Sequence, residues 1–239
     1  MASSSKGLVR RICAAIALIA VAATASSCSG PLQQAFLNIR EPFRSPDFVS
    51  IGAQDTVGLI TAANHDNGLE YRKLLGDFVE EALKKERPDI KVIPYWQTLS
   101  VINTGGYTAD YARMLNTYTT TGILDKDVLT KLGAALGAKY LIHPRIIDFN
   151  QKQTIRFQPF GFTMFLTHET EIKIYMEVWD AKNGAIVWIG AAEAHMASEH
   201  FMSKPIPFEE VAKLTIETLL KKMPLGAKAI KTAAEDAKK

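Results

Sequence analysis

Residues 171–198 read EIKIYMEVWD AKNG AIVWIGAAEAHMAS, two β-rich stretches around a short turn sequence. Asn183-Gly184 is the dipeptide that favours a two-residue type I′ turn between antiparallel strands. That turn predicts a register in which Trp179 faces Trp188 across the strands, because turn length fixes which residues lie opposite each other. We therefore predict a long C-terminal β-hairpin with one face in a hydrophobic core.

The rest of the chain adds helices and short strands to this hairpin. Apolar residues at helical spacing predict helices, and short β-rich runs predict strands. The predicted helices cover 71–83, 99–103, 109–118, 125–136 and 208–220, and the predicted strands cover 55–62, 90–93 and 140–149. Asp125 is placed to cap its helix and Gly137 to end it. This order indicates a single-domain α/β sandwich over residues 55–222, with helices packed on a mixed sheet of about five strands.

The first 27 residues have the layout of a signal peptide. Lys6, Arg10 and Arg11 precede an apolar and small-residue run over 12–25, and the segment contains no acidic residue. The run is shorter than the roughly 20 apolar residues that a membrane-spanning helix needs. We predict that residues 1–27 are removed.

Ala25-Ser26-Ser27-Cys28 resembles a lipobox, the motif in which the cysteine is acylated and becomes the new N-terminus. Ala25 departs from the Leu that is usual there, and Ala23-Thr24-Ala25 also satisfies ordinary cleavage, which would release a soluble protein. Cys28 is the only cysteine after the leader, and acylation accounts for a thiol without a partner in an oxidising compartment. We predict attachment of acyl chains such as palmitate at Cys28. In the sorting rule of such lipoproteins, Ser29 implies the periplasmic face of the outer membrane of a Gram-negative bacterium.

The charge of the mature chain is balanced. The chain has 28 basic and 25 acidic residues, and three of the basic ones lie in the leader, so 25 of each sign remain. This balance argues against nucleic acid as a partner. Residues 28–54 contain scattered polar residues and no sustained period, which predicts a flexible tether. Residues 223–239 are rich in Lys and Ala and predict a mobile tail.

Two segments carry a resemblance to a known family. Leu132-Gly133 followed by LGAKYLI at 136–142 resembles the helix-to-strand junction of a family of periplasmic lipoprotein domains, and VWDAKNGAIVW at 178–188 resembles the hairpin of the same family. The family includes the curli-secretion lipoprotein, the lipoprotein activator of a penicillin-binding protein and the amino-terminal domain of the Tol-system propeller protein. The resemblance covers about residues 55–222. It implies a small α/β domain that binds other envelope proteins and is not an enzyme.

A search of the sequence for catalytic chemistry leads to the same expectation. The sequence contains neither a Gly-rich phosphate loop after a strand nor a G-x-S-x-G nucleophile turn. Its five histidines lack the short spacings of zinc sites. We expect no catalytic residue, metal site or cofactor. An envelope-remodelling enzyme remains an alternative, and it would need a deep pocket that collects two or more of His143, His168, His195 and Glu193.

The most unusual segment is IRFQPFGFTMFL at 155–166, which predicts an apolar loop between strands. Its aromatic and sulfur-containing residues are Phe157, Phe160, Phe162, Met164 and Phe165. Three explanations compete: the loop belongs to the core, it contacts a partner or another copy of the chain, or it enters a lipid surface. We predict these five residues as the partner-binding site.

These observations favour an outer-membrane lipoprotein whose periplasmic domain binds other envelope proteins as an assembly, secretion or regulatory component. Binding would use the aromatic loop and an exposed sheet edge. A ring-forming secretion component that oligomerises through the same loop is the alternative from the structural class.

Overall fold

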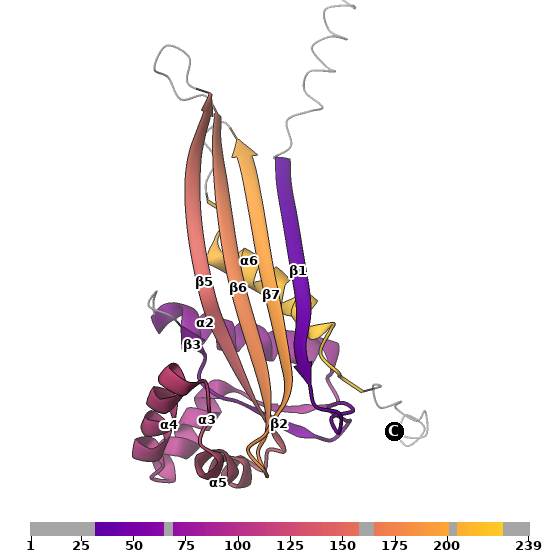
Figure 1. Ribbon diagram of the computed structural model, residues 1–239, viewed down its shortest axis with the longest axis vertical. Helices are drawn as coiled ribbons and strands as arrows, with labels where there is room; N and C mark the ends of the chain where they lie inside the picture. Colours follow the sequence, from indigo (N-terminus) through magenta and orange to yellow (C-terminus); the bar gives the residue numbers. More distant parts are fainter. Residues whose placement is uncertain (1–31, 65–68, 158–164, 201–204, 227–239) are drawn as a thin grey trace, which may run out of the picture.

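The computed structural model describes residues 32–64, 69–157, 165–200 and 205–226. Its seven-stranded sheet has the order β1-β7-β6-β5-β2-β4, with β3 paired to β5 (Figure 1). The strands are β1 (Leu32–Arg44), β2 (Thr56–Leu59), β3 (Ala63–Asn64), β4 (Lys91–Ile93), β5 (Tyr140–Phe157), β6 (Phe165–Asp180) and β7 (Ile186–His200). The helices are α2 (Leu69–Glu86), α3 (Tyr95–Thr104), α4 (Thr108–Thr121), α5 (Lys126–Leu136) and α6 (Phe208–Leu220).

The sheet is mixed, as predicted. β2 runs parallel to β4 and β5, and β3 runs parallel to β5. The pairs β5–β6, β6–β7 and β7–β1 are antiparallel. The α/β class, the mixed sheet and the C-terminal hairpin of β6 and β7 are therefore confirmed. The sheet has more strands than the predicted five because β1 and β3 were missed.

Helices cover the sheet unequally. α2 and α6 pack on one face, where Ile172, Ile174, Met176 and Val178 of β6 are fully buried. α3, α4 and α5 gather at one end of the other face and form a second core with Trp179. The long strands continue past this second group, and over their upper part Figure 1 shows no described helix in front of β1, β7, β6 and β5. We call this uncovered surface the open face.

The predicted register of the C-terminal hairpin is wrong by one residue. Trp188 lies opposite Val178, and Trp179 lies opposite Ile186, so the two indoles belong to different cores. A type I′ turn needs positive φ at both central residues, but Gly184, at φ 70°, is the only residue of this turn with positive φ. The turn is instead closed by Asp180, whose backbone N–H donates to the carbonyl of Ala185 over 2.9 Å. The loop is therefore longer than the predicted two residues. The strand pairing shifts with it, and Trp179 and Trp188 point to opposite faces of the sheet instead of the same face.

The predicted tether over 28–54 is also corrected. Residues 32–44 form β1, an edge strand paired with β7. Farther along, Phe48 and Ile51 are buried in the first core. The ordered domain thus includes residues well before the predicted start at 55. It also continues past the predicted end at 222, since Leu225 forms a bridge with Ile51.

Two predicted ends of α5 are confirmed. The Asp125 carboxylate accepts hydrogen bonds from the backbone N–H of Asp127 and Val128, at 2.9 and 3.1 Å. Gly137 ends the helix in the left-handed region, at φ 61°.

Candidate interaction surface

β1 gives the sheet a long free edge. It pairs with β7 on one side, and no described strand pairs with it on the other. Its side chains alternate: Leu37 and Ile39 pack against the first core, whereas Phe36 and Arg40 are exposed. The register shifts between Arg40 and Phe43, around Pro42, which cannot donate a ladder hydrogen bond and suits an edge strand. An unpaired strand edge offers backbone groups to which an extended segment of another protein can pair.

The open face next to this edge is polar and carries both signs of charge. The Lys173 Nζ atom lies 3.0 Å from a carboxylate oxygen of Glu171 and 3.3 Å from one of Glu193, which links β6 to β7. Nearer the start of β1, the His195 Nε2 atom lies 4.0 Å from Glu169. The charged side chains of Lys173, Glu171 and Glu193 favour hydration of this face, so it is a surface for polar contacts.

Phe36 is the more exposed of the two large apolar side chains of β1 on this face, Phe36 and Phe43. The side chain of Phe36 is 64% exposed. It borders a hollow of about 290 Å³ that is lined by Gln34, Ala35, Phe36, Thr167, Glu169, His195 and Ala197. An exposed aromatic ring beside a polar hollow is an arrangement that interfaces use, because aromatic residues contribute most to binding energy there.

A buried carboxylate lies where the open face meets the second core. Glu177 of β6 is 5% exposed. The Tyr118 hydroxyl of α4 donates to its Oε1 over 2.8 Å, and the Trp179 indole N–H donates to its Oε2 over 3.1 Å. The guanidinium of Arg145 on β5 lies 3.5 Å from Oε1. These partners satisfy the carboxylate and tie α4 to the sheet.

His143 lies beside this carboxylate without a hydrogen bond. It is fully buried, and its Nδ1 atom is 3.6 Å from the Glu177 Oε2. The Tyr118 ring packs edge-on against it, with centroids 4.6 Å apart. Burial lowers the pKa of His143, against the opposing effect of Glu177, so the ring is neutral at pH 7.

The electrostatics of the cluster keep Glu177 charged and Tyr118 protonated. Burial alone would raise the pKa of Glu177, but contacts with His143, Tyr118 and Arg145 outweigh it and leave the pKa below its ordinary value. Burial, and then the charge of Glu177, raise the pKa of Tyr118. Sequence reasoning missed this cluster, although a charged residue between Met176 and Val178 in a core strand was a signal.

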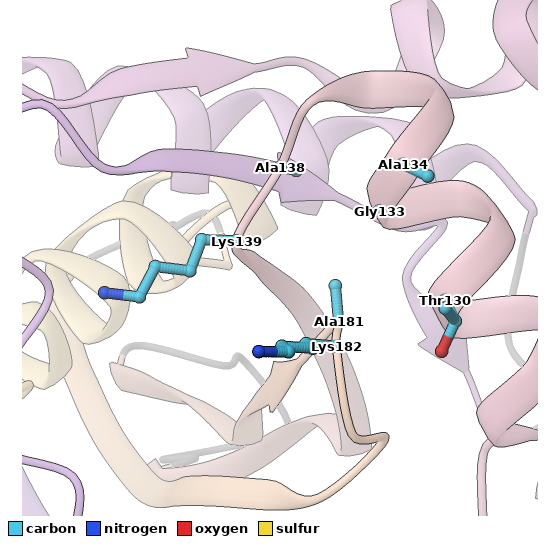
Figure 2. A pocket seen from close by; sticks show the side chains of 7 residues that line it. All are labelled: Thr130, Gly133, Ala134, Ala138, Lys139, Ala181 and Lys182. Carbon is cyan, nitrogen blue, oxygen red and sulfur yellow. The ribbon is translucent and has the colours of Figure 1, made fainter.

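The two segments that carry the family resemblance meet at one junction. Gly133 of α5 faces Ala181 of the β6–β7 turn, and the Ala181 backbone N–H donates to the carbonyl of Lys139 over 3.0 Å. A hollow of about 270 Å³ here is lined by Thr130, Gly133, Ala134, Ala138, Lys139, Ala181 and Lys182 (Figure 2). Lys139 and Lys182 extend in the same direction, away from the helix that carries Thr130 and Ala134. The junction is therefore a packing contact that fixes α5 against the hairpin.

The structure separates the histidines named for an enzymatic site. His143 lies opposite Glu177, and His195 lies opposite Glu171, six residues earlier on β6. Six residues of strand correspond to about 20 Å. His168 is buried and, by strand alternation, points to the helix-covered face, opposite to His195. Within the described residues, no three His, Cys, Asp or Glu side chains are grouped to hold a metal ion.

The predicted partner-binding residues are described only in part. Phe157 and Phe165 end β5 and begin β6, where they pair with each other, so these two belong to strands rather than to a loop. Phe160, Phe162 and Met164 lie outside the described residues, as does Cys28. None of the helices in the described part of the chain is long and apolar enough to cross a membrane.

Comparisons with known proteins return remote structural matches. No protein-family model matches the sequence, and no curated protein does. A PelC dodecamer from Paraburkholderia phytofirmans is 12% identical, with a TM-score of 0.45, over 80% of this chain and 100% of that one. Lipoprotein GNA1162 from Neisseria meningitidis is 12% identical, with a TM-score of 0.36, over 70% of this chain and 96% of that one.

A further match is the C-terminal domain of LpoB from Salmonella enterica, which is 10% identical, with a TM-score of 0.35, over 60% of this chain and 84% of that one. One of these matches, GNA1162, is a lipoprotein, the class of protein that the two motifs resemble. Each likeness concerns the fold, and nothing about partners or assembly is transferred from it.

Proposed function

We propose that this protein is a lipoprotein of the Gram-negative outer membrane, acylated at Cys28, whose periplasmic domain binds other envelope proteins. It would act as an assembly, secretion or regulatory component and not as an enzyme. The observation that carries the proposal is β1, a 13-residue edge strand that begins four residues after Cys28 and whose outer side pairs with no strand of the described residues. A lipid anchor raises the local concentration of such an edge at the membrane.

The partner in this proposal contributes an extended segment that adds to β1, with side-chain contacts to Phe36 at the neighbouring hollow. Backbone pairing supplies affinity, and alternate side chains supply specificity. The residues that the sequence predicts as partner-binding, Phe157, Phe160, Phe162, Met164 and Phe165, remain predicted contacts for the same partner.

The test is photo-crosslinking in intact cells from a benzoylphenylalanine at Arg40. Phe36→Ser should remove the crosslinked products. Ile123→Ser is the matched control, because Ile123 is 62% exposed but lies between α4 and α5. Products that persist in Phe36→Ser would place binding elsewhere. Labelling with a clickable fatty acid should be lost in Cys28→Ala, and equal labelling of both proteins would exclude this anchor.

A ring-forming component is the second candidate, and a second free edge favours it. Among the strands that the structure describes, β2 and β3 pair with β5 only up to Ile146, and beyond that residue only β6 pairs with it. Pairing of β1 in one copy with this part of β5 in the next would be a head-to-tail contact, which can close a ring. Mass photometry of the solubilised lipoprotein distinguishes the candidates, since a monomer argues against the ring.

A further inference from the structure

Four residues from the four long strands form one row across the sheet. Leu32, the first residue of β1, lies opposite Glu199, Glu199 lies opposite Thr167, and Thr167 lies opposite Thr154. We call this set the terminal row. The β5–β6 pairing continues beyond it, through Ile155 with Leu166 and then Phe157 with Phe165. Phe165 is two residues past Thr167, so the paired strands extend about 7 Å beyond the row.

The spacing between Cys28 and the terminal row is short. Leu32 is the fourth residue after Cys28, and an extended chain covers at most about 3.6 Å per residue. The Cys28 backbone can therefore lie at most about 14 Å from the row. If the acyl chains of Cys28 are in a bilayer, this end of the sheet must lie close to the headgroups. We call the paired residues of β5 and β6 beyond the terminal row the β5–β6 extension. It reaches about 7 Å past the row, which is half of the roughly 14 Å that Cys28 can reach.

The residues beyond the terminal row suit contact with lipid. On β5 and β6 they are Ile155, Arg156, Phe157, Phe165 and Leu166, and Arg156 is the only charged one. Ile155 is 52% exposed. Apolar and aromatic residues partition into the membrane interface, and a cationic side chain is attracted to anionic headgroups.

The opposite end of the hairpin differs in composition. The turn after Asp180 carries Lys182 and lies beside α5, which begins with Lys126 and Asp127. The 15 residue steps of β6 hold this end about 50 Å from Phe165. Figure 1 shows α3, α4 and α5 at the end of the sheet opposite to the end at which β5 stops and β6 begins.

We infer that the β5–β6 extension, defined by Ile155, Phe157, Phe165 and Leu166, contacts the lipid surface into which the acyl chains of Cys28 insert. The sheet then stands on the membrane, with the β1 edge along the membrane normal and the helices α3 to α5 in the periplasm. This inference rests on the proposed acylation at Cys28. It adds an orientation to the proposed function: a partner that pairs with the β1 edge must approach it parallel to the membrane surface.

The test uses the full-length lipoprotein in liposomes of phosphatidylethanolamine and phosphatidylglycerol that contain a clickable lipid. Benzoylphenylalanine replaces Ile155 in one sample and Ile123 in the other, because both side chains are more than half exposed. After irradiation, we expect lipid adducts from position 155 to exceed those from position 123 at least fivefold. Equal yields, or adducts at 155 to a second copy of the chain, would overturn the inference.

The mass of the N-terminal peptide from the same samples reports acylation separately. If Cys28 carries no acyl chain, the proposed anchor fails. A chain that begins at Cys28 is then coupled through its thiol to maleimide lipids, and the two positions are compared again. A fivefold preference for position 155 in that sample supports the orientation without the natural anchor, and equal yields refute it.

Discussion

Gly133 and Ala181 are in direct contact, and a Cβ atom on Gly133 would lie 2.4 Å from the Cβ of Ala181. Gly133→Ala should therefore destabilise the protein by about 1–3 kcal/mol, as overpacking typically does, although alanine favours helix more than glycine. Urea denaturation measures the free energy of unfolding. Adding Ala181→Gly should recover part of the loss because it removes the clashing methyl group. A double variant as unstable as the sum of the two single variants would contradict this contact.

The buried hydrogen bond from Tyr118 to Glu177 predicts an unequal effect of removing tyrosine hydroxyl groups. Tyr118→Phe leaves a charged oxygen without its donor and should cost about 1–3 kcal/mol. Tyr111→Phe is the comparison: its hydroxyl donates to the Thr61 Oγ1 atom and accepts from the Thr61 backbone N–H, both over 3.0 Å. Because both partners are neutral and Thr61 is only half-buried, the loss should be about 1 kcal/mol. Equal losses in urea denaturation would show that the charge of Glu177 does not matter.

The same cluster predicts that stability falls at acid pH. Burial holds the pKa of His143 below its ordinary value, so below about pH 6.5 the unfolded chain binds a proton that the folded chain excludes. Glu177 also has a lowered pKa, so its contribution is present above about pH 4.5 and is lost as the pH falls through the folded-state value. His143→Phe should flatten the loss of stability between pH 6.5 and 5. An unchanged slope in denaturation series would exclude His143 as its cause.

The alternation along β1 predicts different effects for adjacent residues. Leu37→Ser removes a side chain that packs on the first core and should cost roughly 1–2 kcal/mol. Phe36→Ser removes an exposed side chain from the opposite face of the strand and should leave stability almost unchanged. Thermal unfolding of both variants measures this. If residues 28–54 were a flexible tether, neither substitution would lower the stability of the protein.

Sequence patterns predicted the elements whose signals are local. The ends of α5 were correct because Asp125 and Gly137 act on their own helix termini. The β6–β7 hairpin was found because the two strands alternate and a turn dipeptide separates them. Its register was wrong, because the left-handed conformation of Gly184 alone, without one at Asn183, lengthened the turn.

Features that depend on distant residues could not be predicted. β1 pairs with β7, which lies about 150 residues later in the chain. The sequence near residues 32–44 contains no local signal that identifies β7 as the pairing strand. The Glu177 cluster joins side chains from α4, β5 and β6, so it exists only after folding. The partner-binding residues were selected by composition alone, and they remain predictions.

Arg87 predicts a large effect from a conservative substitution. The guanidinium is 3% exposed, and it donates two hydrogen bonds of 2.8 Å to Asp89 and further ones to the carbonyls of Ile51 and Gly226. It therefore ties the segment after β1 to the segment after α6. Lysine cannot reproduce this planar donor set, so Arg87→Lys should cost about 2–4 kcal/mol. The exposed Lys84, in the last turn of α2, pairs with Glu80, and Lys84→Met should change stability little because solvent screens such pairs. Urea denaturation of both variants is the measurement, and equal stabilities would show that the two chain segments are held by apolar packing alone.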